Sequence, residues 1–510
     1  MTQNDTLSQA GHLGPAVASR TPLVGGPRGL RRRLHWPVLV LVGLAILATV
    51  NIFTLPTREG VGLAAVALML VLMFMKMPIA FALMISGVVG LFSVSGFRAV
   101  ESVTASTPMS ATASWSLSVL PMFILMGMLL AASGSTTRVY NAARLWLGWV
   151  PGGLAFGTNV AGAGLAAVSG STIANSYALG RIGIPEMLRA GYDRRLAVGS
   201  VIVAGLPGQV IPPSTFLIIV AGITGAAVGP QLIAGIVPGL LMSILLGITI
   251  LLLAILWPAL VGKGRRAKAS QSEHDVQTTW RERFSSLGGV WPLAVLFLAI
   301  FGGMFGGVLT ATEAGAVGAF VALLITWWFQ RKNHPVSHIV KGAVDAVTTV
   351  GAIFLVLLGA HVLTNMIAVT GLGRAFSDII LSLGFGRVEF LLVLMVGYII
   401  LGMFMDPLSM LLLTVPILLP SLDTLGIDLL WFGVFAVLMG ELAIITPPIG
   451  LLTFIIYGLT KDPAINLGHK ISLKDVFVAV GWFMPTAVVL VVILILFPEI
   501  VTWLPSLMAT

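Results

Sequence analysis

The chain has 510 residues, of which 57% are hydrophobic and only 9% are charged, and its mean hydropathy is +1.04. Because soluble domains carry about 25% charged residues, this composition excludes an ordinary soluble protein and predicts an all-α polytopic membrane protein. The net charge of +9 comes from short basic runs between apolar segments, which is typical of cytoplasmic loops and not of nucleic-acid binding, and the lack of cysteine excludes disulfides and thiolate metal sites.

The N-terminal part predicts a tail followed by one additional span. Residues 1–35 are polar, glycine-rich and basic, and we expect a disordered cytoplasmic tail. Residues 36–58 contain the first apolar run, 38–55, and predict an extra N-terminal transmembrane helix. A signal peptide is the competing interpretation, but the long tail and the lack of a small-residue cleavage site argue against it.

A first repeat half is predicted at 60–260. The apolar stretch 60–94 exceeds the ~20 residues of one span, and Lys76-Met77-Pro78 interrupts it, so we expect two helices or one sharply broken helix. A stretch rich in small residues predicts a re-entrant hairpin at about 158–180. A broken helix is predicted at about 196–225, because residues 205–214 hold three prolines and two glycines at membrane depth.

Such a break has a physical cost that points to a cavity. Each proline removes a backbone donor and clashes with the preceding turn. An unpaired backbone group in hydrocarbon costs several kcal/mol, so broken backbone persists only inside protein or along a watery cavity. A simple proline kink in a structural helix is the alternative interpretation.

A second repeat half is predicted at 289–505, after a cytoplasmic loop at 261–288 in which basic residues outnumber acidic ones. Pairs of residues in the two halves lie at nearly one offset: Pro212 and Pro447 (447 − 212 = 235), Asp193 and Asp428 (428 − 193 = 235), Gly199 and Gly433 (234), and Pro185 and Pro416 (231). We therefore expect a second hairpin at about 403–422, a second broken helix at about 430–458 and a last span at 476–504. Matched interruptions in two halves point to a transporter binding site at the repeat interface.

The candidate substrate- and cation-binding residues lie at these hairpins and breaks. Free N–H groups at half-helix N-termini suit a carboxylate, whereas unwound carbonyls and hydroxyl groups suit Na⁺. The candidates are Ser169, Gly170, Ser171, Thr172, Asn175, Pro207, Gly208, Gln209, Pro212, Pro213, Ser214, Gly402, Asp406, Ser409, Thr446, Pro447, Pro448 and Gly450. The Na⁺ candidates among them are Ser169, Ser171, Gly208, Gly402, Asp406 and Thr446.

Structural roles compete with these assignments. Hydroxyl groups in membrane helices often bond only to the preceding turn. Asp406 and Glu441 are the clearest intramembrane acids and therefore functional candidates, but Asp406 before Pro407 also suits a helix N-cap. Thr310 and Glu313 form a Thr-x-x-Glu pattern that predicts a capping box.

Catalytic signatures are absent from the sequence. It contains neither a Gly-x-x-x-x-Gly-Lys-[Ser/Thr] phosphate loop nor a His-Glu-x-x-His zinc motif. We therefore expect a protein that is not an enzyme and has no cofactor.

At these motifs the chain resembles the large membrane subunit of tripartite ATP-independent periplasmic (TRAP) transporters, over about residues 60–505. The motifs are Met-Pro-Ile-Ala-Phe-Ala-Leu at 77–83, Leu-Pro-Met-Phe-Ile-Leu-Met-Gly at 120–127, Ser-Gly-Ser at 169–171, Ile-Pro-Glu-Met at 184–187, Ile-Pro-Pro-Ser at 211–214, Gly-Ile-Val-Pro-Gly-Leu-Leu at 235–241, Gly-Met-Phe-Met-Asp-Pro at 402–407 and Ile-Thr-Pro-Pro-Ile-Gly-Leu at 445–451. The resemblance implies an elevator-type transporter in a bacterial inner membrane that takes up a small organic anion, usually a carboxylate, with Na⁺ as the coupling ion. It also implies two partners, a small four-helix membrane subunit and a periplasmic substrate-binding protein.

The sequence departs from the family pattern at two places. It has Asn175 where some members carry Asp shortly after Ser-Gly-Ser, and it has the extra span at 36–58. The main alternative is an organic-anion/cation symporter that works without a binding protein. A channel is a weaker alternative, because nothing resembles a repeated selectivity filter, and a membrane enzyme is weaker still.

The basic loop predicts the orientation of the chain. A cysteine introduced at Ser270 should resist an impermeant thiol reagent in sealed, right-side-out cells, because the lysine and arginine excess at 261–288 places this loop in the cytoplasm. Permeabilised cells serve as the positive control, and rapid labelling of sealed cells would reverse the predicted topology.

Overall fold

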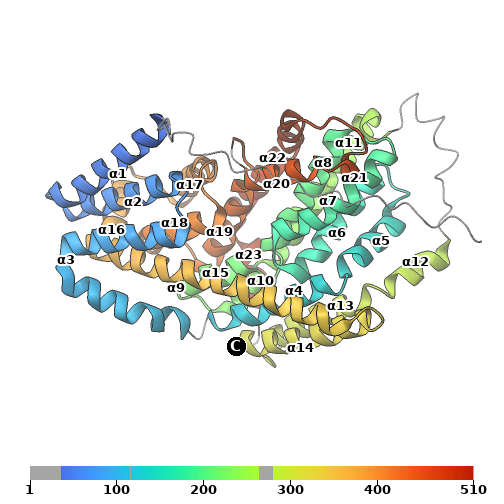
Figure 1. Ribbon diagram of the computed structural model, residues 1–510, viewed down its shortest axis with the longest axis horizontal. Helices are drawn as coiled ribbons and strands as arrows, with labels where there is room; N and C mark the ends of the chain where they lie inside the picture. The colour runs from blue at the N-terminus through green and yellow to red at the C-terminus, as the bar shows by residue number, and fades with distance from the viewer. Residues whose placement is uncertain (1–35, 115–116, 263–278, 449, 509–510) are drawn as a thin grey trace, which may run out of the picture.

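The computed structural model describes residues 36–114, 117–262, 279–448 and 450–508. Within these ranges all regular elements are helices (Figure 1), as the composition predicts. The predicted tail at 1–35 and most of the predicted loop at 261–288 lie outside the described residues, and so does the side chain of Ser169.

The helices that precede the first hairpin confirm that the apolar stretch 60–94 is divided in two. They are α1 (Trp36–Thr54), α2 (Arg58–Phe74), α3 (Ile79–Thr112), α4 (Val119–Ala132) and α5 (Ser135–Leu147). The division falls at Lys76, which has a left-handed backbone (φ 66°), and at Pro78, which precedes α3. α1 occupies the predicted extra span, and α3 itself bends at Gly96, where φ is 74°.

The rest of the first half contains the hairpin and the broken helix. Its elements are α6 (Gly153–Ser169), α7 (Thr172–Arg189), α8 (Arg194–Gly205), the 3₁₀-helix η2 (Leu206–Gln209), α9 (Thr215–Thr224), α10 (Val228–Ala234), α11 (Ile236–Leu256) and the 3₁₀-helix η3 (Pro258–Val261). The hairpin is formed by α6 and α7, and the break separates α8 from α9.

The second half has the same order of elements around its own hairpin and break. Its elements are α12 (Trp280–Leu287), α13 (Trp291–Phe305), α14 (Ala311–Gln330), α15 (Pro335–Thr370), α16 (Leu372–Ser382), α17 (Arg387–Gly402), α18 (Pro407–Thr424), α19 (Leu429–Ala443), α20 (Leu451–Leu459), α21 (Pro463–Asn466), α22 (Leu473–Leu496) and α23 (Glu499–Ser506). The predicted single span at 476–504 is wrong: α22 ends at Leu496 and α23 begins after Pro498, which cannot donate a backbone hydrogen bond.

Side-chain caps begin the equivalent helices at equivalent residues. Asp193 accepts a hydrogen bond from the Arg195 N–H at the start of α8, and Asp428 accepts one from the Trp431 N–H at the start of α19. The two caps are 428 − 193 = 235 residues apart. Because an N-cap satisfies donors that the helix itself leaves free, the shared offset in the sequence fixes where both broken helices begin.

Long helices form one side of the molecule. α3 and α15 pack along each other (Figure 1), and α14 packs on α4. With 36 residues, α15 is ~54 Å long at 1.5 Å per residue, which exceeds a hydrocarbon core of ~30 Å. α15 is therefore long enough to cross the hydrocarbon core even when it is tilted.

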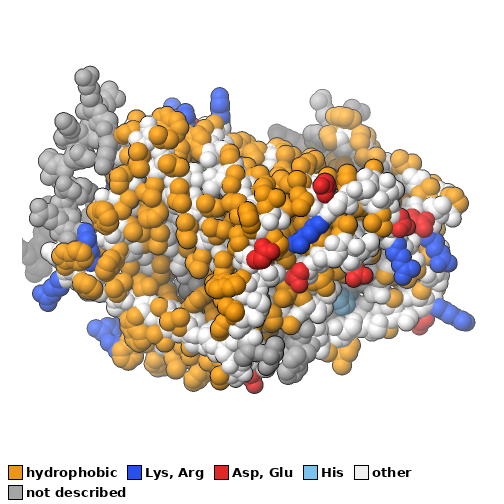
Figure 2. Space-filling model, turned by 180° about the vertical axis from the view of Figure 1, so that it is seen from behind, with side chains coloured by type: hydrophobic (Ala, Val, Ile, Leu, Met, Phe, Trp, Pro, Cys, Tyr) orange, Lys and Arg blue, Asp and Glu red, His pale blue; other side chains and the backbone are white. Residues whose placement is uncertain are grey.

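The length and surface of the helices fit a membrane protein. Seven of the helices in the described ranges are long and apolar enough to cross a membrane, or up to nine if each of two bent pairs counts as one span. Hydrophobic side chains cover much of the face in Figure 2. α1 keeps only Ala48 and Ile52 buried, so lipid is the natural solvent of its remaining surface.

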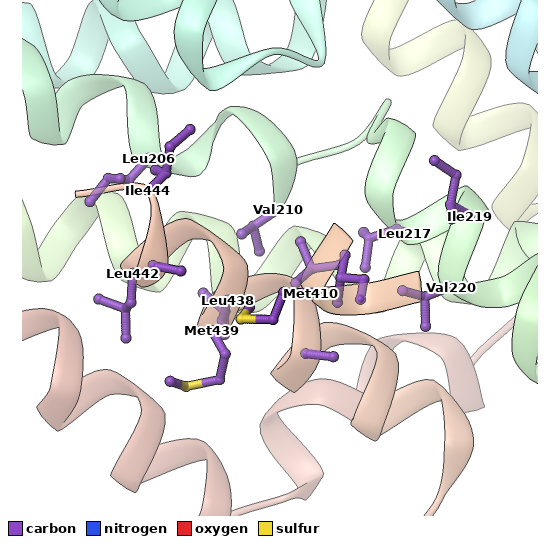
Figure 3. Close-up of a cluster of buried hydrophobic side chains, with 14 of the residues drawn as sticks. Leu206, Val210, Leu217, Ile219, Val220, Met410, Leu438, Met439, Leu442 and Ile444 are labelled. Atoms are coloured by element: carbon purple, nitrogen blue, oxygen red, sulfur yellow. The ribbon is translucent and has the colours of Figure 1, made fainter. Parts of the chain in front are cut away.

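The core lies where the two broken helices meet. α8 is buried from Leu196 to Gly205, and α19 is buried from Trp431 to Ala443. In Figure 3, Leu206 lies beside Ile444, and Leu438 and Met439 of α19 lie near Met410 of α18. A helix that is apolar on all sides belongs inside protein, so these short segments are shielded by the surrounding helices.

Candidate functional site

The turn of the first hairpin rests on the first broken helix. Gly170 has a left-handed backbone (φ 55°), and a Cβ atom built on it would lie 2.5 Å from the carbonyl oxygen of Pro213. The next residue, Ser171, caps α7 by accepting a hydrogen bond from the Ala174 N–H. Only glycine combines this backbone conformation with so close an approach, which explains the glycine of the Ser-Gly-Ser pattern.

The first break is closed by its own polar groups. Ser214 accepts a hydrogen bond from the Leu217 N–H (3.1 Å) and donates one to the carbonyl oxygen of Gln209. The Gln209 side chain accepts a hydrogen bond from the Phe216 N–H at 3.4 Å. Pro212 and Pro213, which are joined by a cis peptide bond, are buried, as are Pro207 and Gly208. These bonds replace part of the helix ladder that the prolines remove.

Asp406 lies at the start of α18, the second helix of the second hairpin. The carboxylate accepts hydrogen bonds from the N–H (3.1 Å) and the hydroxyl of Ser409, so it caps α18 with Pro407 at the first helical position. Asp406 is half-buried, and Ser409 is buried. The capping role is therefore present, and it leaves Asp406 a possible cation ligand, because a carboxylate can accept further interactions.

The second break is more open than the first. The Thr446 hydroxyl donates to the carbonyl oxygen of Leu442 at 2.6 Å, and the Gly450 N–H donates to the carbonyl oxygen of Thr446 at 3.0 Å. Pro448 is exposed and Pro447 is half-buried, whereas the equivalent prolines of the first half are buried. The two breaks thus share a backbone plan but differ in exposure.

Each hairpin packs against the break of its own half. In the first half, a Cβ atom on Gly208 would lie 3.0 Å from the Thr172 N. In the second half, a Cβ atom on Gly402 would lie 2.2 Å from the Cβ of Ala443. The structure therefore brings the predicted residues together in two groups, one for each half.

A hydrogen bond between side chains also joins the two groups. The Thr172 hydroxyl, in the first turn of α7, donates a 2.7 Å hydrogen bond to Oε2 of Glu441 in α19. The sequence marked both residues, but the 269 positions between them gave no sign that they meet. Thr172 and Glu441 are both buried. Asn175, one turn further along α7, is buried as well.

A cavity of about 140 Å³ adjoins the first group. It is lined by Leu120, Phe123, Ile124 and Met128 of α4, Gly170 and Ser171 of the hairpin turn, Gln209, Pro213, Thr215, Phe216 and Ile218 of the broken helix, and Thr349 and Ile353 of α15. This lining contains no basic side chain, so an anion here would be held by backbone N–H groups and neutral polar groups. The candidates of the second half do not line this cavity.

Comparisons with known proteins place the chain among transporter subunits. The family described as "Tripartite ATP-independent periplasmic transporter, DctM component" matches residues 66–500. The chain is 32% identical over 387 residues to the 2,3-diketo-L-gulonate TRAP transporter large permease protein of Escherichia coli (76% of this chain, 87% of that protein). It is 30% identical over 469 residues to the C4-dicarboxylate TRAP transporter large permease protein of Vibrio cholerae (87% of this chain, 98% of that protein).

A solved structure shares the fold. The YdaH transporter of Alcanivorax borkumensis, whose crystal structure is described as having an unusual topology, superposes with a TM-score of 0.54. The similarity covers 79% of this chain and 89% of that one, at 15% sequence identity.

The contact of Gly170 with Pro213 can be tested by adding one methyl group. Gly170→Ala should lower the melting temperature in detergent more than Gly225→Ala does. Both residues have left-handed backbones (φ 55° and 74°), but a Cβ atom at Gly225 meets nothing within 4 Å. The control should therefore lose only the ~1–2 kcal/mol that a left-handed alanine costs. Equal melting temperatures for the two variants would contradict a tight contact between the turn and the break.

Proposed function

Because this chain belongs to the DctM family of TRAP transporters, we propose that it performs secondary active uptake of a small organic anion, fed by a periplasmic substrate-binding protein and coupled to a Na⁺ gradient. The chain is a multi-pass protein of the bacterial inner membrane. The observation that supports the proposal most directly is the pair of helix breaks, each packed against its own hairpin turn, at an offset of 447 − 212 = 235 residues.

The proposed substrate is a carboxylate. The relatives from Escherichia coli and Vibrio cholerae are named for 2,3-diketo-L-gulonate and C4-dicarboxylates, which are organic acids. In this chain Ser171 and Thr215 line the cavity, and α7 and α9 begin at Thr172 and Thr215. Helix N-termini favour an anion through their free N–H groups and their partial positive charge.

The proposed Na⁺ ligands are oxygen atoms at the two hairpin turns and breaks. Backbone carbonyls at Gly208 and Gly402 and the side chains of Ser171, Asp406 and Thr446 supply the hard oxygen donors that this cation prefers, and the backbone of Ser169 ends α6 beside them. Asp406 adds negative charge, which favours a cation over a neutral ligand. The Na⁺ gradient would supply the driving force of uptake, because bound Na⁺ would cross the membrane together with the substrate.

The proposed movement is of the elevator type. The two hairpins and breaks form one packed group, whereas α3, α4, α14 and α15 pack against each other. The cavity lies on the boundary between these parts, because α4 and α15 line one wall and the hairpin turn with the broken helix lines the other. A displacement of the group along these helices would carry a bound anion with it.

The proposed partners are a small four-helix membrane subunit and the binding protein, and the word tripartite in the family description agrees with three components. The alternative is a self-sufficient organic-anion/cation symporter. In that case the binding protein would be dispensable.

Reconstitution separates these alternatives. The substrate is first chosen as the carboxylate that raises the melting temperature of the co-encoded binding protein most. Proteoliposomes with both membrane subunits should then take up this carboxylate only when its binding protein is added, because delivery of substrate depends on that protein. A binding protein from an unrelated system is the matched control. Full uptake without any binding protein would favour the self-sufficient symporter.

The coupling ion is tested with the same proteoliposomes. With an inward Na⁺ gradient we expect uptake, and with choline in place of Na⁺ we expect the rate of protein-free liposomes. This follows from the hydroxyl, carbonyl and carboxylate oxygens at the hairpins, which suit a metal cation. An equal rate with a proton gradient and no Na⁺ would argue against Na⁺ coupling.

A further inference from the structure

Glu441 is a completely buried acid with one unused oxygen. It lies near the end of α19 with a relative exposure of 0%. Oε2 accepts the hydrogen bond from Thr172, whereas Oε1 has no hydrogen-bond partner among the described residues. An acceptor oxygen that is both buried and unused is costly, because its interaction with water is lost and not replaced.

The surroundings of Glu441 do not supply a positive side chain. The ion pairs in the described ranges involve Glu186 and Asp475, and neither involves Glu441. Its sequence neighbours Met439, Leu442 and Ile444 belong to the buried apolar cluster of Figure 3. An ionised carboxylate in such a place is strongly destabilised unless a cation compensates it.

The partner that Glu441 does have favours its charged form. Thr172 is the first residue of α7, so the carboxylate lies against a helix N-terminus, which carries a partial positive charge. The Thr172 hydroxyl adds one donor. These two contributions offset part of the cost of the charge and leave Oε1 free for a metal cation.

The hydrogen bond between Thr172 and Glu441 has no equivalent at the matching positions of the repeat. At the offset of 235, Glu441 corresponds to Leu206 (441 − 235 = 206), and Thr172 corresponds to Pro407 (172 + 235 = 407). The equivalent pair therefore has neither a carboxylate nor a hydroxyl. A structural bond required by the repeated fold would be expected in both halves, whereas a ligand position need occur only once.

We propose that Glu441 is a Na⁺ ligand at the junction of the two halves, with Oε1 bound to the cation and Thr172 holding Oε2 in position. Glu441 would thus add a ligand next to the first-half hairpin turn, because Thr172 follows Ser171 and contacts Gly208, and the assignment rests on the proposed Na⁺ coupling. Because α7 and α19 come from different halves, the site is complete only when they are docked. Na⁺ binding would therefore stabilise the packed group of hairpins and breaks.

The experiment measures Na⁺-dependent melting of the full chain, purified with its small membrane subunit, at fixed pH. NaCl is titrated against KCl at constant ionic strength, and the Na⁺ concentration that gives half of the rise in melting temperature is recorded. Glu441→Gln keeps the shape and an oxygen for Thr172 but removes the charge. We expect it to raise this concentration by about tenfold or more, since even an indirect partner of a metal ligand contributes 10- to 100-fold.

Two sets of controls keep the result interpretable. Glu313→Gln makes the same chemical change at an exposed capping residue of α14 and should keep the wild-type Na⁺ response. If Glu441→Gln does not fold, Thr172→Val and Thr172→Ser replace it. Valine removes the hydroxyl and should weaken the Na⁺ response, whereas serine should restore it.

The outcomes separate this inference from the proposed function. An unchanged Na⁺ response in Glu441→Gln, or in Thr172→Val where that variant replaces it, overturns the assignment of Glu441 and leaves Na⁺ coupling intact. A wild-type protein that melts at the same temperature in NaCl and KCl contradicts both. A weakened response in Glu441→Gln with a normal response in Glu313→Gln supports the site.

Discussion

A break in a membrane helix leaves backbone groups that must find partners away from water, and the rest of this structure depends on how that requirement is met. In the first half, Ser214 and Gln209 supply side-chain partners to the broken segment. In the second half, the backbone closes on itself, since the Leu452 N–H donates to the carbonyl oxygen of Ile444 at 3.0 Å. The helices around the breaks then exclude lipid. The same fixed and partly unpaired groups are what a transported ion or anion can use.

Glycines at matched positions allow the hairpins to reach the breaks. A Cβ atom on Gly205 would lie 2.8 Å from the carbonyl oxygen of Thr172, and one on Gly440 would lie 3.1 Å from the Cβ of Pro407. Gly440 lies 235 positions after Gly205 (440 − 205 = 235), and Pro407 lies 235 positions after Thr172 (407 − 172 = 235). The repeat is therefore a repeat of contacts and not only of helix breakers. This explains how two sequences with few identical residues keep one backbone plan.

The sequence predicted the features that local chemistry determines. Prolines, glycines and caps located the hairpins and breaks, because these residues restrict the backbone wherever they occur. The capping box of Thr310 and Glu313 is confirmed for the same reason. Local patterns could not predict the contact of Thr172 with Glu441. This contact depends on packing between distant segments, which an almost uniformly apolar sequence does not encode in its local pattern.

The difference between the halves matters as much as their similarity. A repeated backbone provides two nearly equivalent sets of helix ends, and two equivalent sets would bind the same ion or anion equally well. Side chains remove that equivalence: Gln209 lines the cavity in the first half, whereas its counterpart at 209 + 235 = 444 is the apolar Ile444. Glu441 in turn has the apolar counterpart Leu206. The buried carboxyl group of Glu441 lies where α7 of the first half meets α19 of the second. The repeat thus supplies the scaffold of the candidate site, and the positions that break the repeat give the two halves different polar groups on equivalent backbone.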